Sequence, residues 1–325
     1  MNPFLRASRA PRLLFAAVCL AASAAAAAQQ WPQKPVTIIV GYAPGGANDV
    51  IARFLAEKLQ PVLKQPVVVD NRPGVASIVG AQAVARSKPD GYTLLMGASG
   101  PMVFNHALYS SLPYKSTDFV PISLTGTFPL VLIVNKDDPA RNVKDLVAES
   151  VRNPQNANYG ASAASFRLIT ELFNEATGAK FAHVGYKGSM ESVTAVMAKT
   201  VSMTIIDAGP AATAINSGRA KPLAVTAAER MKEYPDVPTM KELGIDSTVT
   251  LWSGLFAPAN TPQPVVDRLH AEVVRIMATP EARERLGGLG VTAASSPSPA
   301  QFSEQIDGEI ARWKQVAQRS GVKAD

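Results

Sequence analysis

The stretch VTIIVGYAPGGANDV at residues 36–50 decides the fold of the N-terminal part of this chain. Its apolar, β-branched run predicts a strand over residues 36–40. After the turn Pro44-Gly45-Gly46, the apolar spacing becomes that of a helix over residues 50–63. Small residues let a ligand approach the backbone, and the first N–H groups of a helix lack partners inside it. The stretch therefore predicts either a site for a small anion, such as a carboxylate, or a tight turn in which Asn48 or Asp49 caps the helix.

The N-terminus has the composition of a secretory signal peptide. Three arginines precede a short apolar stretch at residues 13–20, and an alanine-rich tract runs from there to Ala28. The apolar part is too short and too rich in alanine for a membrane span. We therefore expect a signal peptide at residues 1–28, cleavage before Gln29 and a periplasmic protein.

Composition limits the remaining possibilities. Cleavage leaves 325 − 28 = 297 residues, and the net charge falls from +6 to +3 because the leader holds three arginines and no acidic residue. The single cysteine, Cys19, lies in the leader, and the histidines at 106, 183 and 270 are scattered. We expect neither a metal nor a cofactor, and the dispersed charge gives little support for a nucleic-acid partner. A chain of this length favours two lobes.

Strand-like and helix-like patterns alternate along the chain, which predicts an α/β fold with largely parallel sheets. The expected strands cover residues 36–40, 66–70, 92–96, 121–124, 130–134, 158–159, 201–206, 223–226 and 251–256. The expected helices cover residues 50–63, 78–87, 166–176, 264–277, 280–286 and 299–318.

Short motifs in a fixed order give the chain a specific resemblance. They are WP at 31–32, KP at 34–35, YAPGG at 42–46, VDNRPG at 69–74, PDGYTLL at 89–95, HVGYKG at 183–188, LAVT at 223–226, PDVPT at 235–239 and FAP at 256–258. In this order and spacing the chain strongly resembles the Bug-type periplasmic receptors of the tripartite tricarboxylate transporter family, over nearly the whole length after the leader.

The resemblance implies a bilobal fold of the type II periplasmic-binding-protein kind, with two open sheets flanked by helices and a ligand cleft between the lobes. Lobe 1 should hold residues 29–124 plus 255–325, and lobe 2 residues 125–254. Such receptors are not enzymes. They close on a small organic acid and deliver it to a separate membrane permease. We expect a monomer.

The resemblance also places the ligand-binding loops. Lobe 1 contributes the loop from Tyr42 to Asp49 and the strand end Ala98-Ser99, and lobe 2 contributes the small-residue loop before the helix over residues 166–176. The candidate ligand-binding residues are Tyr42, Ala43, Pro44, Gly45, Gly46, Ala47, Asn48, Asp49, Ala98, Ser99, Ala161, Ser162, Ala163, Ser165, Arg167 and Asp207.

Two of these candidates have alternative interpretations. The lobe-2 loop is shorter than in many family members, and Arg167 stands where they have a histidine. Arg167 could form a fork for a carboxylate, or pair with Glu171 four residues on as an exposed helix residue, which we favour. Asp207 follows an expected strand and could either accept a hydrogen bond from a ligand amine or hydroxyl, or cap the next helix.

A secreted serine esterase is the alternative function. The sequence Gly160-Ala161-Ser162-Ala163-Ala164 nearly matches a nucleophile elbow, with Ser162 as the nucleophile. The order of nucleophile, acid and late histidine that a hydrolase of this kind needs is not visible, so a receptor is the favoured prediction.

Overall fold

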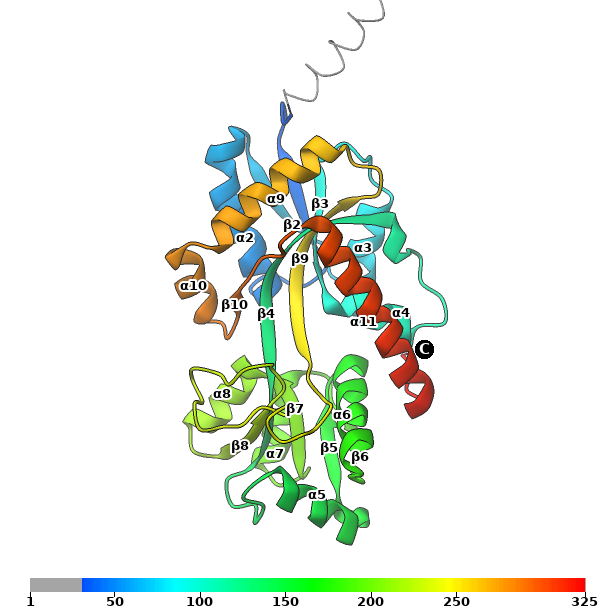
Figure 1. Ribbon diagram of the computed structural model, residues 1–325, viewed down its shortest axis with the longest axis vertical. Helices are drawn as coiled ribbons and strands as arrows, with labels where there is room; N and C mark the ends of the chain where they lie inside the picture. Colours follow the sequence, from blue (N-terminus) through cyan, green and yellow to red (C-terminus); the bar gives the residue numbers. More distant parts are fainter. Residues whose placement is uncertain (1–30, 325) are drawn as a thin grey trace, which may run out of the picture.

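The computed structural model describes residues 31–324, so the predicted signal peptide lies outside the described residues. Two bodies, one above the other in Figure 1, are joined by two long strands, β4 (Phe119–Asn135) and β9 (Thr250–Pro258). We call them the upper and the lower lobe.

The upper lobe begins with three parallel strands in the order β2, β1, β3. They are β1 (Val36–Val40), β2 (Val67–Asn71) and β3 (Thr93–Ala98), and the helices α2 (Ala47–Leu63) and α3 (Ile78–Ala85) connect them. Ile51, Leu55 and Leu59 of α2 are fully buried. This spacing of three to four residues explains why the predicted helix forms and which face it buries against the sheet.

Strand β4 belongs to both lobes. It pairs with β9 from Phe119 to Pro129, and from Leu130 onward with β7 (Met203–Asp207) and β8 (Ala220–Val225). The prediction of separate strands at residues 121–124 and 130–134 was therefore wrong, because the residues between them continue the ladder past two irregularities in register. The two expected sheets share β4, and their strands form one path in the order β2-β1-β3-β9-β4-β7-β5-β6.

The lower lobe is built around parallel strands with helices at their carboxyl ends. Strand β5 (Asn158–Ala161) lies between β6 (Ala182–Gly185) and β7. The helices are α5 (Val143–Arg152), α6 (Ala164–Thr177), α7 (Ser189–Met197) and α8 (Ala208–Asn216). Helices α6, α7 and α8 directly follow β5, β6 and β7, so their N-termini gather at one edge of the sheet.

The C-terminal segment returns to the upper lobe. It consists of α9 (Gln263–Met277), α10 (Pro280–Gly287), the two-residue strand β10 (Thr292–Ala293) and α11 (Pro299–Ser320). Helix α11, red in Figure 1, runs from the upper lobe toward the lower one. Near its end, Arg319 Nε lies 2.8 Å from Glu175 Oε1 of α6. Helix α11 thus connects the lobes a third time.

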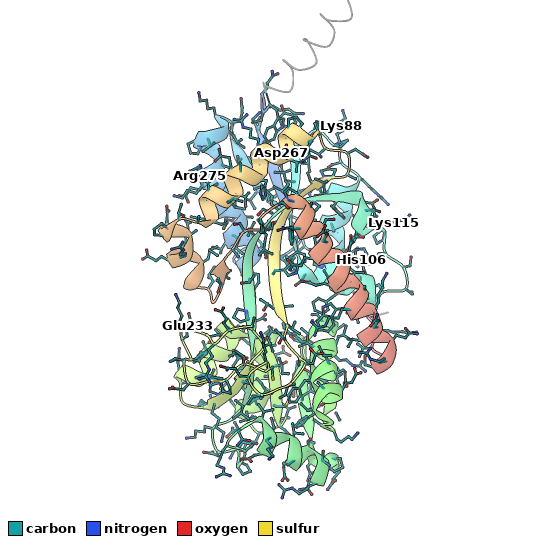
Figure 2. All side chains as sticks on the ribbon, in the orientation of Figure 1. Lys88, His106, Lys115, Glu233, Asp267 and Arg275 are labelled. Carbon is teal, nitrogen blue, oxygen red and sulfur yellow. The ribbon has the colours of Figure 1, made fainter. Side chains whose placement is uncertain are left out.

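Charged side chains are spread over the surface. Lys88, Lys115, Glu233, Asp267 and Arg275 occupy separate places on the periphery of both lobes (Figure 2). Within residues 31–324, no helix combines the length and the apolar character that crossing a membrane requires. The side chains that bear on function lie between the lobes.

Candidate ligand-binding site

A cavity of about 910 Å³ lies between the lobes, beside the point where β4 and β9 pass from one to the other. Phe128 of β4 and Leu251 and Trp252 of β9 form part of its wall. Eleven of the sixteen candidate residues line it: Tyr42, Ala47, Asn48, Ala98, Ser99, Ala161, Ser162, Ala163, Ser165, Arg167 and Asp207. The fold therefore brings the predicted loops of both lobes to one cavity.

The other five candidates lie outside the lining of this cavity. Ala43, Pro44, Gly45 and Gly46 are exposed, while Asp49 is buried beneath the loop. The Gly45 N–H donates to Asp49 Oδ2 at 2.9 Å and so is not free for a ligand. Gly45 also has a φ of +87°, a conformation that favours glycine. Their placement does not support the prediction of direct ligand contact for these five residues.

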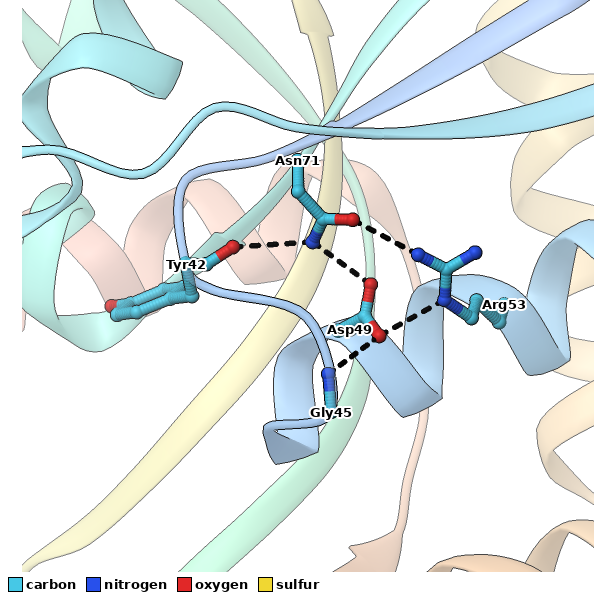
Figure 3. A network of polar contacts seen from close by, with 5 residues as sticks. All are labelled: Tyr42, Gly45, Asp49, Arg53 and Asn71. Carbon is cyan, nitrogen blue, oxygen red and sulfur yellow. Dashed lines mark hydrogen bonds and ion pairs between the residues drawn. The ribbon is translucent and has the colours of Figure 1, made fainter.

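Asp49 organises the first loop (Figure 3). Its carboxylate accepts hydrogen bonds from Arg53 Nε at 2.9 Å and Asn71 Nδ2 at 2.8 Å, besides the one from Gly45. Burial alone would raise the pKa of Asp49, but these hydrogen bonds outweigh it and hold the pKa below its usual value. Asn71 Nδ2 also donates to the Tyr42 carbonyl at 3.1 Å. The network fixes the loop whose far end forms the cavity wall.

Two polar side chains of that loop face the cavity. Asn48 Oδ1 accepts a hydrogen bond from Ser253 of β9, which leaves the Asn48 NH₂ group as the donor for a ligand. Burial raises the pKa of the Tyr42 hydroxyl, so this group remains protonated and can donate. Neither Asn48 nor Asp49 is the N-cap of α2. That position is Gly46, so the capping alternative was wrong.

Four helices begin at or beside the cavity without a capping side chain. The N-caps of α2, α6, α7 and α8 are Gly46, Ala163, Gly188 and Asp207, and none of them makes a side-chain capping bond. Away from the cavity, α5, α10 and α11 are capped by Asn142, Thr279 and Ser298, while α9 has no capping side chain either. Uncapped N-termini carry unpaired N–H groups and a partial positive charge. Their convergence makes the cavity attractive to an anion.

Arg167, in the first turns of α6, adds a full positive charge. The favoured pairing with Glu171 was wrong, because Glu171 accepts instead from the Tyr159 hydroxyl at 2.7 Å and from Asn174 Nδ2 at 3.2 Å. Arg167 lines the cavity, and its Nε is buried without a hydrogen-bond partner among the described residues. Burial, and then the nearby Arg167 charge, lower the pKa of His183 on the same wall. His183 therefore stays neutral near pH 7.

Asp207 ends β7 and starts α8. Its Oδ2 accepts from Ser189 Oγ at 3.2 Å, and Ser189 Oγ lies 3.5 Å from Ser162 Oγ. Although Asp207 occupies the N-cap position, it makes no capping hydrogen bond, so the capping alternative was wrong here too. Burial raises the pKa of Asp207 to about 6.

A comparison with known families identifies the fold and the receptor class. Residues 51–322 match the family described as "Tripartite tricarboxylate transporter family receptor". The chain belongs to this receptor family.

Solved structures of similar receptors support this assignment. The periplasmic binding protein BugD is 31% identical with a TM-score of 0.74, covering 90% of this chain and 99% of that one. Rpa4515 of R. palustris, solved with adipate, is 32% identical with a TM-score of 0.77, over 90% and 99% of the two chains. MatC from Rhodopseudomonas palustris, with bound malate, is 29% identical with a TM-score of 0.73, over 88% and 99%. The predicted Bug-type resemblance and α/β periplasmic-binding-protein fold are confirmed.

Much of the receptor's cavity wall was not predicted from the sequence. The upper lobe adds mainly apolar side chains, while the lower lobe adds Tyr186 and the first residues of α8. The lining residues outside the candidate list include Ala76, Phe104, Asn105, Leu108, Tyr109, Phe128, His183, Tyr186, Leu251, Trp252, Leu289, Gly290, Lys323 and Ala324. Trp252 is almost fully buried and also lines the cavity. Most of these residues come from segments without a small-residue loop, and the family resemblance did not place them in the site.

Proposed function

We propose that this chain is a periplasmic receptor that binds a small organic acid in the cavity between its lobes and delivers it to a membrane permease of the tripartite tricarboxylate type. One observation carries the proposal: uncapped helix N-termini from both lobes converge, with Arg167, on a single cavity. Hydrogen bonds from N–H groups or a guanidinium to a carboxylate are short and strong. The site is therefore suited to an organic anion.

The ligands of similar receptors support this class of substrate. Rpa4515 was solved with adipate and MatC with malate, both of which are dicarboxylates. In this chain, the candidate contacts are the eleven lining residues from Tyr42 to Asp207 named above. Asp49 and the exposed part of the first loop support these residues without lining the cavity.

The proposal includes two lobes that move relative to each other. Lobe 1 comprises residues 29–124 plus 255–325, lobe 2 comprises residues 125–254, and the signal peptide at residues 1–28 is removed on export. The change of pairing partner along β4, at Pro129 and Leu130, supports a hinge close to the first boundary. Closure around such a hinge would enclose the ligand. The receptor acts as a monomer and performs no catalysis.

The geometry around Ser162 disfavours an esterase. Ser162 Oγ has Ser189 Oγ as its hydrogen-bond partner, and no imidazole bonds to it within the described part of the chain. A serine nucleophile needs a base within hydrogen-bond reach. Ser162 is better suited to donate a hydrogen bond to a ligand.

Thermal unfolding against a panel of acids tests the proposal. The leaderless protein is unfolded and refolded to remove any co-purified ligand, then heated with dicarboxylates, tricarboxylates, aromatic acids, amino acids and the corresponding amides, which lack the carboxylate charge. A ligand at about a hundred times its Kd adds about 2.7 kcal/mol, which raises the Tm by several degrees. We expect a shift from one class of acid and none from its amide. Equal shifts from acids and amides, or none at all, would contradict the proposal.

A further inference from the structure

The lower lobe places a carboxylate in a cavity that otherwise attracts anions. Asp207 is the only acidic residue among the described residues that line it. None of the ion pairs among residues 31–324 includes Asp207, and its one side-chain donor is the neutral hydroxyl of Ser189. An unpaired, half-buried carboxylate is costly, and it repels the carboxylate of a ligand. No cationic side chain among the described residues therefore pairs with Asp207.

Arg167 lines the same cavity and lacks an anionic partner among the residues that the structure describes. It takes part in none of those ion pairs, and its buried Nε has no hydrogen-bond partner in the described chain. Arg167 and Asp207 do not pair with each other. They extend from the ends of neighbouring parallel strands, since α6 follows β5 and α8 follows β7. A ligand that brings an opposite charge to each of these groups carries one negative and one positive charge.

The other residues of the cavity wall indicate the chemical character of the uncharged part of the ligand. Leu108, Tyr109, Phe128, Leu251 and Trp252 contribute apolar surface to the cavity. Pockets of this kind bind the apolar part of a ligand, while a few polar groups fix its orientation. A small diacid has little apolar surface with which to fill such a wall.

We propose that the ligand is a zwitterionic amino acid with an apolar body, its carboxylate held by Arg167 and its ammonium group by Asp207. This inference rests on the proposed function and narrows the class of organic acid. The ammonium supplies the counter-charge of Asp207, and the carboxylate supplies that of Arg167. Removing the amine from such a ligand leaves Asp207 unpaired and adds repulsion between two carboxylates.

Pairs of ligands that differ in the amine alone test the inference. Calorimetric titrations at pH 7.5 compare L-phenylalanine with 3-phenylpropionate, L-leucine with 4-methylpentanoate, and 5-aminopentanoate with pentanoate. We expect at least one amino acid to bind the wild type ten or more times more tightly than its amine-free partner. In Asp207→Asn, that preference should fall below threefold, while the amine-free acid binds at least as tightly as to the wild type. Retained binding of the amine-free acid also shows that this variant is folded.

The control is Asp236→Asn, which removes an exposed carboxylate of the same lobe outside the cavity lining. It should keep the wild-type preference. If amine-free acids bind the wild type as tightly as the amino acids, or if no amino acid binds while other acids do, the inference is overturned and the receptor function stands. If no acid of any kind binds, both fail.

Discussion

The raised pKa of the Asp207 carboxyl group predicts that this group destabilises the unliganded protein at neutral pH. Its pKa in the folded state, about 6, is above its ordinary value of 3.8 because of burial. The folded state therefore binds more protons than the unfolded state between those values, so the free energy of unfolding falls as the pH rises through that window. A shift of about two units corresponds to at most about 3 kcal/mol, and partial exposure reduces this to about 1–2 kcal/mol.

Replacement of this carboxyl group should reverse that effect. We expect Asp207→Asn to raise the Tm of the ligand-free protein by a few degrees at pH 7.5 and by little or nothing at pH 4. The other ionisable groups on the cavity wall are unchanged in the variant and present in both measurements; they are Tyr42, Tyr109, Arg167, His183, Tyr186 and Lys323. Thermal unfolding at the two pH values measures the difference. A variant that is less stable than the wild type at pH 7.5 would show that Asp207 is paired within the protein.

A charge added at Ala163 tests the anion preference of the site. Ala163 is the exposed N-cap of α6 and lines the cavity, so a longer side chain can be accommodated there. We expect Ala163→Glu to weaken binding of the preferred acid by more than tenfold, because its carboxylate competes for the N–H groups of the helix. Ala163→Gln, of nearly the same size, should weaken it much less. Calorimetric titration of both variants decides, and equal losses would point to steric blocking instead.

At the scale of elements, α3 crosses the end of β1 at a contact between two glycines. A Cβ on Gly80 would lie 2.7 Å from the Gly41 Cα, which is backbone and cannot move aside. We expect Gly80→Ala to destabilise the protein by about 2 kcal/mol or more, through the displacement of α3. Chemical denaturation measures the loss. A change below about 0.5 kcal/mol would show that the helix can shift freely.

Helix α11 contains a glycine whose replacement by alanine should have the opposite effect on stability. Gly308 is exposed within this helix, and an added Cβ meets no atom within 4 Å. Alanine should therefore stabilise the protein by about 0.5–1 kcal/mol, since glycine loses more backbone entropy in a helix. The same denaturation experiment measures it. Destabilisation by Gly308→Ala would contradict the description of this helix face as free of contacts.

Several elements with strong apolar periodicity were predicted well and several weakly patterned ones were missed, although the amphipathic helix α5 was missed too. The expected strand at 36–40 and helix at 264–277 agree with β1 and with α9 to within a residue. Strand β6 was missed because its residues are mostly exposed or half-buried, which leaves no apolar alternation. Helix α8 was missed since its sequence is mainly small residues and includes Gly209 and Pro210. Local pattern predicts an element only where the core requires large apolar side chains.

The site was predicted in part for a related reason. Glycine and alanine loops before helices can be recognised in a sequence, and the family resemblance placed Ala47, Ala161 and Ser162 in such loops. Tyr109, Leu289 and Lys323 come together through tertiary packing of segments far apart in the chain, which no local pattern reveals. Asp49 organises the first loop through hydrogen bonds with Arg53 and Asn71. Asn71 lies 22 residues away in the sequence, so no local pattern indicated this role.

At the scale of the whole molecule, contacts other than β4 and β9 also join the lobes. The Arg319–Glu175 pair links α11 to α6, and both side chains are about half exposed. On the other side, a Cβ on Gly290 would lie 3.4 Å from the Gly209 nitrogen, so the loop after α10 approaches the start of α8. The second of these contacts borders the cavity, because Gly209, Leu289 and Gly290 line it.

The exposed ion pair should have little influence on closure. Pairs of this kind contribute about 0.2–1 kcal/mol. We therefore expect Glu175→Gln to change ligand affinity by less than about fivefold, and by less still at high salt, because salt screens exposed charges. Titration at two salt concentrations measures this. A loss of tenfold or more would mean that the pair governs the closed state.

The most direct test of the receptor function is a calorimetric titration of refolded protein with the most stabilising acid and with its amide, which lacks the carboxylate charge. We predict a 1:1 complex with the acid and at least a hundredfold weaker binding of the amide, because the uncapped helix N-termini and Arg167 act on the charge. Equal binding of acid and amide, or no binding of any carboxylate that the panel contains, would contradict an organic-acid receptor.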